Sequence, residues 1–212
     1  TGNMIDSGAL TIKGTSTFVT SANDATITLD QGGHAFKGAL LITTNDTASD
    51  TAGNVTISAG SGETLNFGSS TIDGDLIATS SNTTGIIDSG ALMVRGTSSF
   101  RTTAGNADIS LDQSTLGDGT GTDTITLNTT GPSGNATLDN QTTVLALGTL
   151  ASLTTSVGGN LTLTTGNALG ITDSDTVTVG GNLSVTTDAN NGVINLGELV
   201  VEGTIALATN DA

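Results

Sequence analysis

The sequence has 212 residues, of which Thr, Gly, Ser and Asn together supply 110, and 20 acidic against four basic side chains give a net charge of −16. So few cations cannot neutralise a phosphate backbone, which excludes a nucleic-acid-binding protein. There is no Cys, which excludes disulfides and thiolate metal sites, and the only histidine is His34. The composition therefore says more about architecture than about any specific activity.

Short runs of alternating apolar and polar residues recur along the chain and predict β-strands. In chain order the clearest are LTIK at 10–13, VTIS at 55–58, ITLN at 125–128, LTLTT at 161–165 and VTVGG at 177–181. The β-branched residues in these runs favour pleated strands, and no segment has apolar residues at helical spacing. We expect an all-β chain with almost no helix. No apolar run approaches the roughly 20 residues that span a bilayer, so no membrane insertion is expected.

Long internal repeats are the main signal. Residues 5–31 match residues 87–113 at 17 of 27 positions, an offset of 82. Residues 74–96 match residues 181–203 more weakly, at an offset of 107. The end of the chain, 190–212, is therefore expected to be equivalent to the first two copies. An insertion of one structural turn explains the difference between the two offsets.

A shorter motif, Gly-x-Leu-x-apolar, lies within these repeats. It begins at Gly8, Gly38, Gly74, Gly90, Gly159, Gly181 and Gly197. The shortest spacings, such as those from Gly74 to Gly90 and from Gly159 to Gly181, are close to the length of one turn of a solenoid, in which stacked units bury a shared apolar face. We predict that residues 1–212 form one continuous single-stranded parallel β-helix (β-solenoid). It should be right-handed, with about nine or ten turns.

The alternative architecture is a tandem array of immunoglobulin-like sandwiches, which the long period would suit. Elastic offsets, few aromatics and a single proline favour the β-helix instead. In that fold we expect an apolar set to point inward, with Gly and Asn at the corners. The inward set is Leu10, Ile12, Ile27, Leu29 and the repeat-equivalent pair Phe18 and Phe100, which should stack on aliphatic neighbours.

Two strings, GALTIKG at 8–14 and GNLTLTTGNALGITDSDTVTVGGNLSV at 159–185, resemble the repeats of filamentous-haemagglutinin-type exoproteins and other β-strand-repeat bacterial surface adhesins. The resemblance implies a right-handed β-helical shaft that is exported to the cell surface or the extracellular space. The Asn-Pro-type motifs of that family's secretion domain do not occur, since the only proline is Pro132. The resemblance therefore implies shaft rather than secretion domain, in a fragment of a longer chain.

One segment suggests a cation site. Residues 118–126 read DGTGTDTIT, similar to the nonapeptide that binds calcium between adjacent turns, although Asp118 stands where a Gly belongs. A single copy lacks a partner turn, so the favoured interpretation is a solvated loop. Asp118 and Asp123 are the calcium candidates, and no other metal or cofactor is expected.

Other polar residues invite structural interpretations. His34, in QGGHAFKG, is expected to be a loop histidine with no second ligand. Lys13 and Arg95 are equivalent in the repeat, and Glu202 takes their position in the third copy. We expect outward charges at strand ends that face an acid on a neighbouring turn.

The leading hypothesis is a non-enzymatic shaft segment of a secreted or cell-surface fibrous adhesin, which acts as a stiff spacer. Its partners would be neighbouring modules of the same chain, other copies of itself or cell-surface glycans. The alternative is a self-assembling surface-layer or extracellular-matrix filament subunit. A third hypothesis is a β-helical polysaccharide lyase or hydrolase that uses paired acids such as Asp173 and Asp175, or Asp46 and Asp50. The scarcity of aromatic and basic residues disfavours this enzyme.

Overall fold

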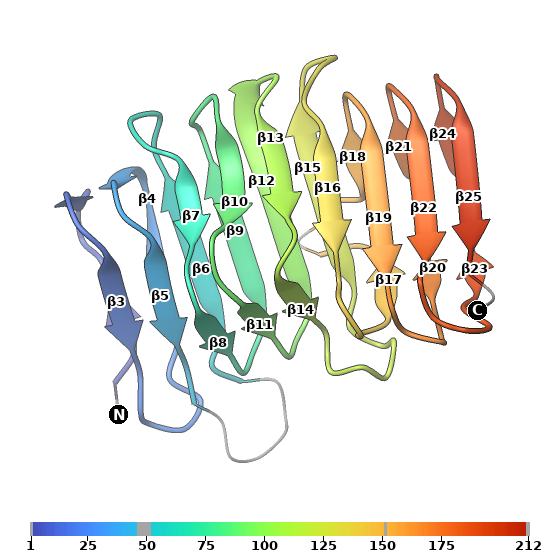
Figure 1. Cartoon of the computed structure of the whole chain (residues 1–212). Coiled ribbons are helices and arrows are strands. Elements are labelled where there is room, and N and C mark those ends of the chain that lie inside the picture. Colours follow the sequence, from blue (N-terminus) through green and yellow to red (C-terminus); the bar gives the residue numbers. More distant parts are fainter. Residues whose placement is uncertain (1, 46–51, 151, 211–212) are drawn as a thin grey trace.

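The computed structural model describes residues 2–45, 52–150 and 152–210, and within them it is a β-solenoid of about nine turns with no helix. Figure 1 shows the turns stacked side by side from the N-terminal to the C-terminal end. Strands run downward in the front sheet and upward in the rear sheet while the turns advance to the right, which is a right-handed path. The predicted all-β parallel β-helix is confirmed, and the sandwich alternative is wrong.

Two parallel sheets run along the stack. The 13-stranded sheet contains β1 (Met4–Ile5), β2 (Thr11–Ile12), β4 (Ile27–Phe36), β6 (Val55–Ala59), β9 (Leu76–Ser80), β12 (Ser98–Gly105), β15 (Ile125–Thr130), β17 (Leu145–Leu147), β18 (Ser156–Val157), β20 (Ile171–Asp173), β21 (Val177–Val179), β23 (Ile194–Asn195) and β24 (Leu199–Val201). The 12-stranded sheet contains β3 (Ser16–Val19), β5 (Leu40–Thr43), β7 (Leu65–Phe67), β8 (Ser70–Ile72), β10 (Gly85–Asp88), β11 (Leu92–Val94), β13 (Asp108–Leu111), β14 (Ser114–Leu116), β16 (Ala136–Asp139), β19 (Leu161–Thr165), β22 (Leu183–Thr187) and β25 (Ile205–Thr209).

The turns differ in length. Residues stacked on one another are 21 apart where Val55 pairs with Leu76 and 28 apart where Ile27 pairs with Val55. Connecting segments tolerate insertions, so turns of unequal length can stack in one solenoid. This elasticity explains why the short motif recurs at uneven intervals.

The core is a column of aliphatic side chains between the two sheets. Within each strand alternate residues are buried, as in the Val55–Ala59 strand β6, where Val55, Ile57 and Ala59 point inward. Of the predicted inward set, Ile27 and Leu29 are buried, whereas Leu10 and Ile12 are half-buried because the first turn is covered on one side only.

The phenylalanines lie inside, as predicted. Phe100 is fully buried and stacks between Ala78 and Leu127. It also meets Phe67 edge to face, with ring centroids 6.4 Å apart. The equivalent Phe18 is half-buried on the first turn and makes the same contact with Phe36 at 6.2 Å.

The sequence copies lie on opposite sides of the solenoid. Met4 belongs to the 13-stranded sheet, whereas Ile86, its equivalent in the second copy, belongs to the 12-stranded sheet. Leu76 and Leu183, which are equivalent in the weaker repeat, are divided in the same way. The offsets therefore correspond to three and a half and four and a half turns. Their difference is one turn, as predicted.

In these copies one side of the turn is longer than the other and contains two short strands joined by a corner. We call it the long side. This long side lies in the 13-stranded sheet at the first turn, as β1 and β2, and again as the single long strand β4. It passes to the 12-stranded sheet for the third to fifth turns and returns to the 13-stranded sheet for the last three. The described chain has no helix long and apolar enough to be a membrane span.

Candidate functional site

The two calcium candidates lie together in the loop between β14 and β15. The Asp118 N–H donates a hydrogen bond to Asp123 Oδ2 at 3.1 Å. Asp118 Oδ1 accepts hydrogen bonds from the N–H and the hydroxyl of Thr120, at 2.8 and 2.6 Å. The loop closes on itself because Gly119 and Gly121 adopt positive φ values of 87° and 82°, which cost glycine little.

The electrostatics of this loop differ between its two acids. The hydrogen bonds from Thr120 lower the pKa of Asp118 below its usual value. Partial burial raises the pKa of Asp123, and the neighbouring Asp118 carboxylate adds to the rise. No group of three or more His, Cys, Asp or Glu side chains in the described residues could hold a metal ion. Calcium binding at Asp118 and Asp123 stays a prediction.

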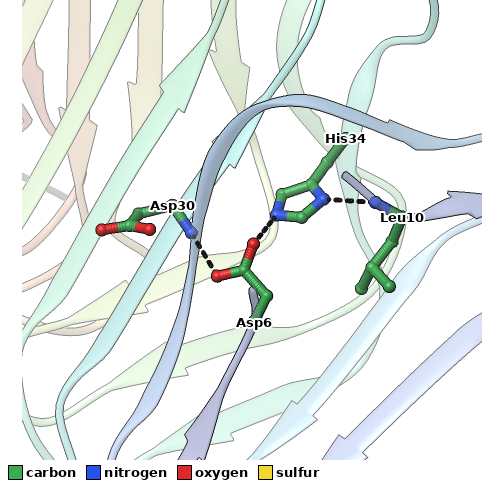
Figure 2. A network of polar contacts seen from close by, with 4 residues as sticks. All are labelled: Asp6, Leu10, Asp30 and His34. Atoms are coloured by element: carbon green, nitrogen blue, oxygen red, sulfur yellow. Dashed lines mark hydrogen bonds and ion pairs between the residues drawn. The ribbon is translucent and has the colours of Figure 1, made fainter. Parts of the chain in front are cut away.

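His34 is not a loop residue. It lies on β4, its side chain is completely buried, and it takes part in the polar network of Figure 2. Its Nδ1 accepts the N–H of Leu10 at 2.9 Å, and its Nε2 lies 2.9 Å from Asp6 Oδ2. Asp6 Oδ1 also accepts the N–H of Asp30 at 3.3 Å. The loop prediction was wrong because the alternation of buried and exposed residues in this strand is interrupted. The four residues before His34 are all exposed, and burial resumes only at the histidine itself.

This network is structural in its chemistry. An imidazole nitrogen that accepts a hydrogen bond carries no proton, so the bond from Leu10 leaves the proton on the Nε2 of His34, which faces Asp6. Both ring nitrogens thereby face polar groups inside the fold. The contacts connect the first turn to the second turn, at the corner where the two short strands of the first turn meet.

An acidic cavity of about 330 Å³ lies near the C-terminal end. It is lined by Asp173, Ser174, Asp175, Thr176, Gly197 and Glu198. Its carboxylates accept hydrogen bonds from close neighbours: Asp173 from Gly197, Asp175 from Thr149 and Glu198 from Thr176, at 2.7, 2.6 and 3.1 Å. None of these lining residues is aromatic or basic, so none could stack on a sugar ring or pair with an acidic sugar. The other acid pair considered for an enzyme, Asp46 and Asp50, lies outside the described residues.

Polar ladders connect the turns at the corners. In one ladder an Asx oxygen accepts the N–H of the residue stacked on it in the next turn, at 2.7 to 2.8 Å, through Asp108, Asn135, Asn160, Asn182 and finally Thr204. A second ladder, before the strands of the other sheet, runs from Asn54 to Asp75 and on to Thr97, with both bonds at 2.8 Å. These bonds pair corner N–H groups that the sheets themselves leave free.

Some of the ladder residues can be recognised in the sequence, because they occupy a fixed place in the Gly-x-Leu motif. In the Gly-x-Leu motif the middle residue is Asp75, Asn160 or Asn182 in three of the seven copies. Short Asx side chains just before a strand are suited to bond with nearby backbone. The His34 network had a weaker signal, since the motif IDSGAL places Asp6 and Asp88 at the same repeat position.

The outward charges agree in part with expectation. Arg95 Nη1 lies 3.1 Å from Oδ1 of Asp73, on the preceding turn. These two residues directly follow Val94 and Ile72, which pair in neighbouring strands. No such partner is found for Lys13 among the described residues, and its neighbour on the stack is Lys37, because Ile12 pairs with Phe36.

The chain was compared with known proteins. Residues 1–43 and 52–118 match a family model described as repeats of unknown function (DUF5649). No curated protein matches the chain, and no solved structure does. The matched residues make up just over half of the sequence and contain both copies of the stronger repeat, so the chain belongs to this family of repeats of unknown function.

Proposed function

We propose that this chain is a shaft segment of a secreted or cell-surface fibrous adhesin of the filamentous-haemagglutinin kind. Its task is mechanical: it holds a binding module at a distance from the surface to which the protein is attached. The observation that carries this proposal is the pair of parallel sheets that continue through all nine turns, with polar ladders at the corners between them.

A rod of this construction is stiff for a physical reason. Every turn is hydrogen-bonded to the next along both sheets. Bending the rod must therefore stretch many backbone hydrogen bonds between turns at once. At about 4.8 Å per turn, nine turns extend roughly 40 Å along the axis. The excess of acidic side chains keeps such a rod soluble and repels neighbouring rods.

Replacement of the segment in its parent protein tests the proposal. One variant receives an unrelated β-solenoid with the same number of turns, and a second receives a flexible Gly/Ser linker of equal contour length. Attachment of cells to their target is measured for each, and antibody labelling of intact cells checks display at the surface.

A spacer predicts that attachment survives the solenoid replacement and falls with the flexible linker. Loss of attachment with both replacements, at equal display, would assign adhesion to this segment itself. Full attachment with both would show that stiffness is not needed. Absence of the native protein from the cell surface would overturn the proposal altogether.

A further inference from the structure

Eight asparagines are followed two residues later by Ser or Thr, which is the acceptor pattern of N-linked glycosylation: Asn45, Asn54, Asn82, Asn128, Asn135, Asn140, Asn160 and Asn182. The structure describes the whole pattern at all of them except Asn45. An attached glycan is bulky and hydrophilic, so in the folded protein the Nδ2 atom that carries it must face solvent. The contacts of each Nδ2 therefore decide which of these asparagines can carry a glycan.

Four of the asparagines use Nδ2 inside the fold. Nδ2 of Asn140 donates hydrogen bonds to three backbone carbonyl groups, and the side chain is completely buried. Nδ2 of Asn82 donates to a carbonyl at 2.8 Å, and the residue is 9% exposed. Nδ2 of Asn128 and of Asn135 donates to a carbonyl and to a carboxylate, at 3.5 and 3.2 Å. At these four sites Nδ2 is aimed at the protein instead of at solvent.

Asn160 and Asn182 have the opposite arrangement. Both are exposed, and the Oδ1 of each accepts a backbone N–H of the next turn at 2.8 Å, as part of the corner ladder. Within the described residues, Nδ2 of neither side chain donates a hydrogen bond. A glycosidic bond replaces one N–H of Nδ2 and leaves Oδ1 unchanged. A glycan at either position is therefore compatible with the ladder.

The two acceptor patterns lie on one another in consecutive turns. Leu161 pairs with Leu183, and Thr162 pairs with Ser184, in the adjacent parallel strands β19 and β22 (Figure 1). Alternation along each strand buries the leucine and leaves the hydroxyl residue on the outer side, on the same side as the preceding asparagine. The third exposed asparagine, Asn54, lies alone in the ladder of the other sheet, where an aspartate follows it.

We propose that Asn160 and Asn182 form an N-glycosylation site, at which Nδ2 of either side chain accepts a sugar from a donor activated as a sugar diphosphate. Nδ2 attacks the anomeric carbon, the bond from this carbon to the diphosphate oxygen breaks, and the diphosphate leaves with the electron pair. One Nδ2 proton passes to a base of the transferase. The two Nδ2 groups lie one turn apart, about 4.8 Å, so a sugar on one crowds the other. This inference goes beyond the proposed spacer role and does not depend on it.

The first test is peptide mapping of the native protein, isolated from the cells that make it. Cleavage before aspartate separates the two positions, because residues 139–172 contain Asn160 and residues 175–187 contain Asn182. Electron-transfer fragmentation keeps the sugar on its side chain and distinguishes Asn160 from Asn140 in the first peptide. We expect a glycan on Asn160 or Asn182 and none on Asn140. One uniform oligosaccharide mass identifies a lipid-carried donor, and steps of single sugars identify a nucleotide-carried donor.

The second test uses variants that keep both asparagines and their ladder bonds. Thr162→Ala removes the hydroxyl of one pattern and should confine the glycan to Asn182. The double variant Thr162→Ala/Ser184→Ala should lose the glycan completely while its melting temperature stays that of the unglycosylated wild-type chain. Thr162→Ser keeps the pattern and should keep the glycan. Thr164→Ala is the matched control, because it removes a hydroxyl on the same outer side of β19 but outside the pattern.

Three results would overturn the proposal. The native protein could carry no glycan, or it could carry glycans only on other asparagines. A sugar that stays on this corner in the double variant would show attachment through another residue. The spacer proposal is unaffected by each of these results, because it is tested by attachment of cells and not by glycan occupancy.

Discussion

Asp6 and Asp88 occupy the same place in two copies of the repeat, but the folded chain satisfies their carboxylates with different partners. Both accept a backbone N–H from the next turn, donated by Asp30 and Asp112, at 3.3 and 3.0 Å. The second oxygen of Asp88 accepts the N–H of Gln113 and the hydroxyl of Ser114, whereas that of Asp6 lies against His34. The aspartate at this corner of the repeat thus meets different polar partners in the two copies.

The first prediction concerns this exchange. In the second copy, Leu116 and Ser114 stand where the first copy has His34 and Gly32. His34→Leu should lower the free energy of unfolding by about 1 to 3 kcal/mol, because the buried Asp6 carboxylate and the Leu10 N–H lose their partner. Denaturant titration measures the change.

Adding Gly32→Ser to this variant should recover part of the loss, since the new hydroxyl takes the place of Ser114. A Cβ at Gly32 meets nothing within 4 Å, so the serine has room. Gly32→Ser alone is the matched control and should be nearly neutral. Equal stability of His34→Leu with and without the serine would contradict the proposed equivalence of the two corners.

The second prediction is a pH dependence at Asp88. Burial raises the pKa of Asp88 above its ordinary value of 3.8, although its three hydrogen bonds oppose the rise. The folded chain therefore holds the proton more tightly than the unfolded chain. This contribution to stability is full below the ordinary value and is lost as pH rises through the raised pKa.

Comparison of melting temperatures for wild type and Asp88→Asn, from about pH 3 to about pH 6, isolates this contribution. The advantage of wild type over the variant should shrink as pH rises. Asp30→Asn, at an exposed acid, should show no comparable trend. An advantage of wild type that grows with pH would reverse the assigned direction.

The third prediction tests the ladder at Asn160, whose Oδ1 accepts the Asn182 N–H at 2.8 Å. Asn160→Ala removes this acceptor and should destabilise the fold by about 1 kcal/mol. Asn160→Asp keeps the oxygen, as Asp75 and Asp108 do in other turns, and should retain most of the stability. Hydrogen exchange should locate the effect of Asn160→Ala at Asn182, and unchanged protection there would argue against the ladder.

The fourth prediction concerns Gly85, at the start of β10. Its φ is +88°, and a Cβ there would overlap the Asp108 carbonyl oxygen on the next turn. Gly85→Ala should therefore cost at least about 2 kcal/mol, from the left-handed backbone and the clash together. Gly105→Ala is the control, because a Cβ at Gly105 meets nothing within 4 Å. Similar thermal stability of the two variants would refute the close approach of the turns.

The fold could be predicted from the sequence because every turn must bury the same kind of alternating apolar face against its neighbours. Alternation such as LTLTT at 161–165 specifies which face is buried, and the short Gly-x-Leu spacing specifies stacking. What the sequence could not show was the face on which each copy lies. An offset of 82 is compatible with whole or half turns, and only the strand pairing of Met4 and Ile86 decides between them.

Single polar sites were harder to predict. The lone histidine, preceded by two glycines, resembles a loop residue, and its burial depends on Asp6 and Leu10, which both lie in the preceding turn. The contact between Asp118 and Asp123 is by contrast local in sequence and closes within one loop. Contacts within one loop could thus be inferred from the sequence. Contacts between turns could not, because they depend on the register in which the strands of adjacent turns pair.

The half-turn displacement of the repeats has a consequence for valency. Residues 5–31 and 87–113 present related outer surfaces, but these surfaces face opposite directions, about 17 Å apart along the axis at about 4.8 Å per turn. A partner that recognised one copy could not reach the second copy from the same side. Two partners would instead bind back to back, so recognition of this repeat favours bridging between neighbouring molecules over tandem binding along one rod.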